Sequence, residues 1–172
     1  MNVILRPWRP EDAADIAPLA NNKAVADNLR DIFPYPYTLQ NAQDFVAMCM
    51  KEDGNGQLLR TIEVDGHAVG SIAVSMGTDV YRKSAELGYW LGEPYWRKGI
   101  MSCAVRKICT EAFKTLDIVR IHAEPYAYNR GSRGVLEKAG FQLEGIMKNS
   151  VFKNGKIFDS CIYALLKEEM QK

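Results

Sequence analysis

The sequence is poor in the residues that form metal sites and disulfide frameworks. Its two histidines, His67 and His122, stand far apart, and its four cysteines include no CxxC pair. This spacing favours neither a zinc site nor a set of disulfides. We therefore expect no metal, and we interpret the thiols as reduced core side chains: Cys49, Cys103, Cys109 and Cys161.

Long apolar runs and an excess of charge are also missing. No run approaches the roughly 18 apolar residues of a spanning helix, and the first residues lack the basic start of a signal peptide, so we expect a cytoplasmic protein. Lys and Arg number 22, against 21 Asp and Glu. Without a basic surplus there is little to attract nucleic acid or an anionic membrane, and we expect neither as a partner.

What is present is the composition of a folded globular chain. The 172 residues are 47% hydrophobic and 25% charged, which argues against disorder. Their number fits one domain that spans residues 1–172, and neither an internal repeat nor a low-complexity linker divides it.

Turn signals and apolar patterns predict a mixed sheet with flanking helices. The Asp-Gly pair at 65–66 and the Asn-Gly pair at 154–155 each join two apolar stretches and predict hairpins. Two further strands, over 85–91 and 118–124, are each followed by a helical pattern, which favours a local parallel pair. The predicted fold class is α+β, with a mixed, mostly antiparallel sheet.

The stretch between the strand over 85–91 and the helix that begins at Ile100 suits an anion. The first turn of this helix has unpaired N–H groups and a partial positive charge. Arg97 and Lys98 add full charges, and Gly99 lets a ligand approach the backbone. A phosphate or pyrophosphate would be stabilised here. The stretch fits neither GxxxxGK[ST] nor GxGxxG, which argues against a kinase or a Rossmann dehydrogenase.

Two segments carry a resemblance to a known family. Residues 95–101 run Tyr-Trp-Arg-Lys-Gly-Ile-Met, and residues 129–145 begin Asn-Arg-Gly-Ser-Arg-Gly and end Ala-Gly-Phe-Gln-Leu-Glu-Gly. In this order and spacing they resemble the GNAT superfamily of acetyl-CoA-dependent N-acetyltransferases. The branch they resemble most is that of the ribosomal-protein serine or alanine N-terminal acetyltransferases. The likeness covers nearly the whole chain, including the aromatic segment at 33–37.

The resemblance implies a place for acetyl-CoA. The strands over 85–91 and 118–124 would splay apart, and pantetheine would lie between them like an extra strand. Its pyrophosphate would rest on the N–H groups of residues 98–102, and Asn129 would bond the pantetheine arm. The cofactor-binding residues implied are Trp90, Leu91, Arg97, Lys98, Gly99, Ile100, Met101, Ser102, Asn129 and Ser132.

The chemistry needs a base for the amine, a hydrogen-bond donor for the oxyanion and a proton donor for the departing thiolate. An α-amino group has a pKa near 8, so one carboxylate acting through water suffices. Glu86, on the central strand where the family often places a carboxylate, is the candidate base, and Glu124 is the alternative. The resemblance implies Ser132 as the proton donor to the thiolate, and the oxyanion donor is expected to be a backbone N–H near Leu91.

Two positions depart from the family pattern. Leu136 stands where many members have a tyrosine general acid, and Val151 matches a glutamate of some members of the ribosomal branch. The favoured interpretation is an enzyme that works by direct attack in a ternary complex. The alternative is a module that binds acyl-CoA without catalysis, as a sensor or scaffold.

The acceptor would be a primary amine, either on a protein N-terminus or on a small molecule. The segment at 33–37 forms either a wall of the acceptor pocket or a loop that seals one end of the core. The candidate acceptor-binding residues are Arg30, Phe33 and Tyr35. A homodimer is compatible with the sequence.

Overall fold

The computed structural model describes residues 2–170, and within them seven strands form one sheet. The strand order is β1-β2-β3-β4-β5-β7-β6, and β4–β5 is the parallel pair among antiparallel neighbours. The predicted mixed, mostly antiparallel sheet is therefore confirmed. The strands are β1 (Val3–Arg6), β2 (Gln57–Val64), β3 (His67–Met76), β4 (Ser84–Leu91), β5 (Arg120–Ala123), β6 (Gln142–Lys153) and β7 (Lys156–Leu166).

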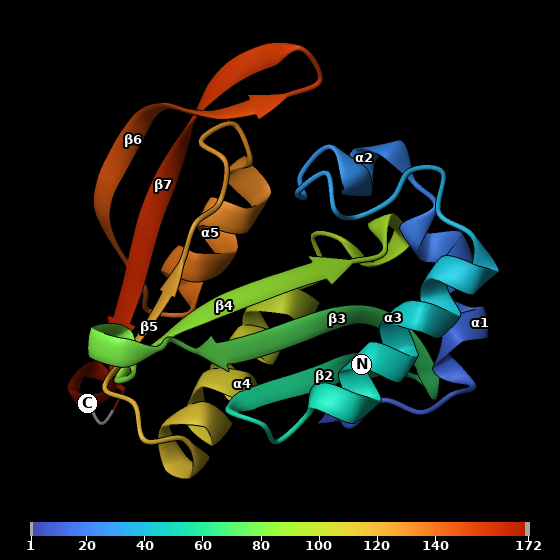
Figure 1. The fold of residues 1–172 in the computed structure, drawn as a ribbon, viewed down its shortest axis with the longest axis horizontal. Helices are drawn as coiled ribbons and strands as arrows, with labels where there is room; N and C mark the ends of the chain where they lie inside the picture. Colours follow the sequence, from blue (N-terminus) through green and yellow to red (C-terminus); the bar gives the residue numbers. More distant parts are fainter. Residues whose placement is uncertain (1, 171–172) are drawn as a thin grey trace.

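Helices cover both faces of this sheet (Figure 1). One core holds side chains of α1 and α3 and of the near face of the sheet, and a larger core lies between the sheet and α4 and α5. Short 3₁₀ turns lie at Asp79–Tyr81, Glu93–Tyr95 and Lys167–Glu169. The α-helices are α1 (Asp12–Ala20), α2 (Lys23–Ala26), α3 (Leu39–Glu52), α4 (Ile100–Thr115) and α5 (Arg130–Lys138).

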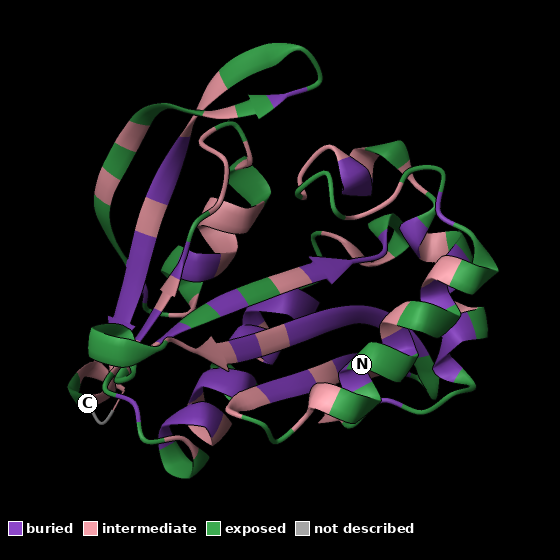
Figure 2. Ribbon diagram, in the orientation of Figure 1, coloured by how far each residue is buried: buried purple, intermediate pink, exposed green. Residues whose placement is uncertain are grey.

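The apolar periods of the sequence explain how these layers pack. In α4 the side chains at four-residue spacing, Ile100, Ala104, Ile108 and Ala112, are all at most 2% exposed. Figure 2 shows buried residues along β2 and β3, while β4 alternates between buried and exposed positions. β4 thus has one apolar face against α4 and one partly open face.

Both predicted hairpin turns are present. Asp65 and Gly66 join β2 to β3 with φ of 51° and 86°, and Asn154 and Gly155 join β6 to β7 with φ of 51° and 74°. Two consecutive positive φ angles define the type I′ turn that these dipeptides favour. The β6–β7 hairpin extends beyond the rest of the sheet (Figure 1).

The parallel pair separates part-way along β4. Three residues of β4 pair with β5, the last being Glu86 opposite His122. β5 ends at Ala123, whereas β4 continues to Leu91 and stays paired with β3 alone. The two strands are therefore splayed at this end of the sheet.

Three of the four cysteines, Cys49, Cys109 and Cys161, are buried, and Cys103 is partly buried. Burial raises the pKa of the Cys49 and Cys109 thiols to about 12, so both stay protonated and unreactive at neutral pH. Between residues 2 and 170 no cluster of three or more His, Cys, Asp or Glu side chains is arranged for a metal ion. None of the helices in this part of the chain has the length and hydropathy needed to cross a membrane.

Candidate active site

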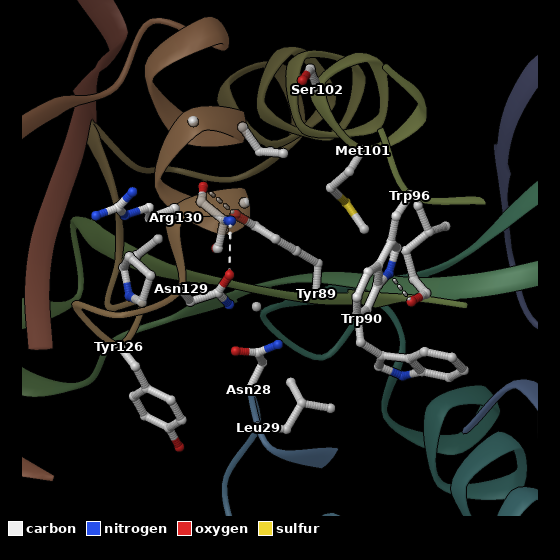
Figure 3. Close-up of a pocket in the computed structure, with 18 of the residues that line it drawn as sticks. Asn28, Leu29, Tyr89, Trp90, Trp96, Met101, Ser102, Tyr126, Asn129 and Arg130 are labelled. Atoms are coloured by element: carbon white, nitrogen blue, oxygen red, sulfur yellow. Dashed lines mark hydrogen bonds between the residues drawn. The ribbon is translucent and has the colours of Figure 1, made fainter. Parts of the chain in front are cut away.

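A cavity of about 850 Å³ opens where β4 and β5 part. Glu86 and Trp90 line it from the α1/α3 face of the sheet, and Leu87 and Tyr89 line it from the opposite face. Figure 3 shows the same arrangement, with Met101 on one side of β4 and Leu29 on the other. The cavity therefore passes through the sheet instead of lying on one face of it.

The backbone of β4 offers polar groups to this passage. The N–H of Gly92 donates to Val69 O at 2.9 Å, which makes Leu91 and Gly70 a non-hydrogen-bonded pair across β3 and β4. The N–H and C=O of Leu91 consequently point away from β3, toward the gap. Its C=O accepts a hydrogen bond from the Trp96 indole at 2.7 Å. The Leu91 N–H, the predicted oxyanion donor, therefore points away from β3 and toward the gap.

The first turn of α4 forms the second wall. Arg97 and Gly99 take positive φ angles of 60° and 75°, which turn the chain sharply into the helix. Gly99 is the N-cap, and no side chain within residues 2–170 caps the helix there. The unpaired N–H groups and the positive end of the helix dipole therefore face the cavity, which residues 99–102 line together with Arg97.

The first turn of α5 forms the third wall. Asn129 is its N-cap, and the Asn129 side-chain oxygen accepts the N–H of Ser132 at 3.0 Å. Both residues line the cavity, so Asn129 caps the helix and also faces the ligand space. The Ser132 hydroxyl lies 2.7 Å from the hydroxyl of Tyr89, which reaches across from β4 (Figure 3). Burial raises the pKa of Tyr89 well above its usual value near 10.

Two carboxylates stand at the open mouth of the passage. Glu86 is exposed on β4, and its side-chain carboxylate has no hydrogen-bonding partner in the described part of the chain. Glu124 follows β5 and accepts a hydrogen bond from the Ser160 hydroxyl at 3.1 Å. Both line the cavity, so a cationic or neutral amine that enters here meets acceptor oxygens first.

Three predicted site residues do not line the cavity. The Lys98 ammonium lies over the Tyr95 ring, 5.7 Å from its centre. Tyr35 is 53% exposed to solvent. Phe33 stacks on Tyr37 and meets Trp90 edge-on, so it supports the cavity wall from behind. Arg30, predicted with Phe33 and Tyr35, does line the cavity.

Tyr89 was not among the sequence-based candidates. Its neighbours of the same strand parity, Leu87 and Leu91, are buried, so the pattern indicates a core-facing position. The available signal is its hydroxyl, since a phenol on a core-facing strand position needs a polar partner. Leu136, at the position of the family tyrosine, is 0% exposed and lies in the main core.

Comparisons with known proteins identify the family of this chain. Residues 2–142 match the model of the acetyltransferase (GNAT) domain family. YdaF of Bacillus subtilis (strain 168), named as a candidate ribosomal N-acetyltransferase, is 30% identical over 99% of this chain and 94% of its own.

Two solved structures are similar over nearly the whole fold. RimJ of Mycobacterium smegmatis, in complex with a CoA disulfide, has a TM-score of 0.87 at 26% identity, covering 99% of this chain and 84% of its own. RimL, a ribosomal L7/L12 α-N-protein acetyltransferase solved with coenzyme A, has a TM-score of 0.85 at 24% identity, covering 96% of this chain and 94% of its own. The chain belongs to the GNAT family and is an acetyl-CoA-dependent N-acetyltransferase.

Proposed function

We propose that the enzyme acetylates the N-terminal α-amino group of a protein, by direct attack of the amine on acetyl-CoA. The observation that carries this proposal is the passage through the sheet between β4 and β5. A thioester that enters from the α4 side can meet an amine that enters beside Glu86. No cysteine of the described chain lines the passage, which favours direct attack over a thioester formed on the enzyme.

The donor half of the passage fits coenzyme A. Its pyrophosphate would rest on the N–H groups at the start of α4, with Arg97 adding charge. Its pantetheine arm would run along the open edge of β4 and bond to Asn129. The N–H of Leu91 would stabilise the oxyanion, and the Ser132 hydroxyl would donate a hydrogen bond to the thiolate.

Glu86 is the proposed base, acting through water. The Glu86 carboxylate is free of hydrogen bonds among the described residues, whereas the Glu124 carboxylate already accepts one from the Ser160 hydroxyl. An α-amino group has a pKa of about 8, so roughly a tenth of it is neutral at pH 7 and the base has a modest task. The name of YdaF, a candidate ribosomal N-acetyltransferase, favours a protein acceptor.

Release of coenzyme A in the presence of different amines tests the acceptor class. Peptides with free N-terminal serine or alanine are compared with N-terminally blocked peptides and with polyamines, amino acids and aminoglycosides. The proposal requires turnover with free N-terminal peptides only. Turnover with small amines alone would assign a small-molecule acceptor, and coenzyme A binding without turnover would identify a sensor module.

The Glu86→Gln variant tests the base. At pH 7 we expect kcat to fall roughly 10²-fold while the Kd for coenzyme A stays constant, and the deficit should narrow above pH 9, where the amine is already neutral. Glu124→Gln is the matched control, with a carboxylate at the same mouth. A larger loss in Glu124→Gln than in Glu86→Gln would exchange their roles.

A further inference from the structure

The Tyr89 hydroxyl makes two contacts, both with Ser132. It lies 2.7 Å from Ser132 Oγ and 3.3 Å from the Ser132 carbonyl oxygen. Inside a helix, the carbonyl of Ser132 already accepts the N–H four residues on, so Oγ is the better acceptor. Ser132 is the sole hydroxyl residue of α5, whose other residues are Arg130, Gly131 and 133–138.

The direction of this hydrogen bond decides where the Ser132 hydrogen points. If Tyr89 donates to Ser132 Oγ, the Ser132 hydroxyl keeps its own hydrogen for a group in the cavity. If Ser132 donates to Tyr89, that hydrogen points into the wall and is lost to the ligand. A phenol is a stronger hydrogen-bond donor and a weaker acceptor than an aliphatic hydroxyl, so donation from Tyr89 to Ser132 Oγ is the favoured direction across the 2.7 Å contact. Burial raises the pKa of Tyr89, so its hydroxyl keeps its hydrogen at neutral pH.

We propose that Tyr89 is a positioning residue for acetyl transfer, whose hydroxyl donates to Ser132 Oγ and so aims the Ser132 hydrogen at the sulfur of the departing thiolate. This inference rests on the role proposed above for Ser132. It assigns a function to the contact between β4 and α5 that packing alone does not require, since a phenylalanine ring would fill the same volume.

Acetyl transfer proceeds without loss of a proton from the Tyr89 or the Ser132 hydroxyl. The amine nitrogen bonds to the thioester carbon, and the carbonyl electrons move to oxygen. Collapse breaks the carbon–sulfur bond, and its electron pair stays on sulfur. The surplus proton of the amine passes through a water molecule to the Glu86 carboxylate. Ser132 stabilises the thiolate by a hydrogen bond, and the thiolate gains a proton from solvent after release.

Tyr89 does not itself supply a proton to sulfur. A coenzyme A thiol has a pKa of about 8.5, and a buried phenol with a pKa above 10 is a weaker acid than that. Transfer of its proton to the thiolate would therefore run uphill. The geometry assigns Tyr89 to orientation and Ser132 to contact with the leaving group.

The test compares Tyr89→Phe, Ser132→Ala and the double variant, with Tyr163→Phe as the matched control. Tyr163 is likewise buried, and its hydroxyl also bonds to α5, where it donates to Glu137 at 2.8 Å and accepts from Arg133 at 3.1 Å. It does not line the cavity. Both tyrosine variants keep the ring and remove a hydroxyl contact with the same helix.

We expect Tyr89→Phe to lower kcat roughly tenfold, with the KM for acetyl-CoA and for the acceptor within about twofold of wild type. The double variant should be no slower than Ser132→Ala, because Tyr89 acts only through Ser132. Tyr163→Phe should leave kcat unchanged while its thermal midpoint falls by as much as that of Tyr89→Phe.

Two results would overturn the inference: an unchanged kcat in Tyr89→Phe, or losses that multiply in the double variant. If Ser132→Ala leaves kcat unchanged, the role of Ser132 and that of Tyr89 fall together. If Ser132→Ala is slow and Tyr89→Phe is not, only the role of Tyr89 falls. Glu86→Gln reports on the base in either case.

Discussion

At the start of α4, the backbone of Gly99 determines what residue can stand there. Its φ of 75° lies in the left-handed region that a residue with a Cβ enters at a cost of about 1–2 kcal/mol. A Cβ built on Gly99 would meet no atom within 4 Å beyond those of Gly99 and its neighbours along the chain. The space beside Gly99 is therefore open, and it lies in the half of the cavity that we assign to the pyrophosphate.

We predict that Gly99→Ala raises the Kd for coenzyme A several-fold, because the methyl group occupies the approach to the N–H groups. Gly66→Ala is the matched control. Gly66 has a φ of 86° and equally free surroundings, but it stands in the β2–β3 turn outside the cavity lining. Both variants should lose about 1 kcal/mol of unfolding free energy in urea, and calorimetry should find a weaker Kd only in Gly99→Ala. Equal Kd values in the two variants would contradict the assignment.

The anion site at the start of α4 could be predicted from the sequence, because a helix N-terminus, a glycine and two basic residues lie together within a few positions of the chain. Tyr89 is different. Its partner Ser132 lies 43 positions away, so only the folded chain brings the two hydroxyls together. The place of the Phe33 ring could not be predicted for a related reason, since the sequence does not reveal that this ring stacks on Tyr37.

At the scale of elements, the tip of the β6–β7 hairpin reaches the loop after α2. Lys153 donates to Asp31 at 2.7 Å, and Asn154 donates to Asp27 at 2.9 Å. The backbone oxygen of Asp27 also accepts the Tyr128 hydroxyl, and Tyr128 lines the cavity. These contacts form a polar bridge, which we define as Lys153–Asp31 plus Asn154–Asp27, beside the mouth that we assign to the acceptor.

We predict that Lys153→Met opens this mouth. The acceptor KM should rise about three- to tenfold, while the Kd for coenzyme A stays constant, because the α4 side is untouched. Since Asp31 is 81% exposed, the ion pair should contribute under about 1 kcal/mol to stability, and the fold should persist.

Lys148→Met is the control for the bridge. The Lys148 ammonium pairs with Asp159 within the same hairpin, and within residues 2–170 it forms no hydrogen bond or ion pair with the loop after α2. Steady-state kinetics with a free N-terminal peptide would compare the two variants. A similar KM in Lys153→Met and in wild type would mean that the bridge does not restrict the acceptor.

Elements with strong local signals were predictable. The hairpins followed from Asp-Gly and Asn-Gly, and the Thr38 cap of α3 is closed by the side chain of Asn41. The helix α2 was not predicted, because its four residues depend on the cap at Asn22 and on packing by Val25. The bridge depends on residues more than 120 positions apart and has no sequence signature.

At the scale of the whole molecule, one cluster of charged side chains links α1 to the strands β1 and β2. Arg6 on β1 donates to both oxygens of Asp12 on α1 at 2.8 Å, and it also contacts Glu63 on β2. Asp12 is 3% exposed. Burial by itself would raise the pKa of Asp12, but hydrogen bonds from Arg6 and from the Arg9 N–H lower it below its ordinary value.

Because the pKa of Asp12 is lowered in the folded state, the free energy of unfolding should fall at acidic pH. A carboxylate with a depressed folded-state pKa stabilises the fold above its unfolded pKa of about 3.9, and the stabilisation is lost as the pH falls through the folded value. We predict that Asp12→Asn lowers the unfolding free energy by about 2 kcal/mol at pH 7, and that this difference shrinks below about pH 4. Urea unfolding at pH 7, 5 and 3 measures it.

Asp117→Asn is the control for the acid effect, because Asp117 is paired with Lys83 but lies 85% exposed. It should change the unfolding free energy little at any of the three pH values. A difference between Asp12→Asn and wild type that stays constant from pH 7 to pH 3 would show that the ionised form of Asp12 does not carry the stabilisation.

The full order of the seven strands could not be obtained from local sequence patterns, because it depends on which distant strands pair, although the hairpins and the parallel pair of β4 and β5 were predicted. It is this order that leaves β4 beside the short strand β5, with a passage between them open to both faces. Acetyl-CoA and the acceptor amine, which enter from opposite faces of the sheet, therefore meet inside this passage. A bisubstrate inhibitor, with coenzyme A tethered through its sulfur and a two-carbon spacer to a peptide amine, would have to be threaded through the sheet, so its escape should be slow.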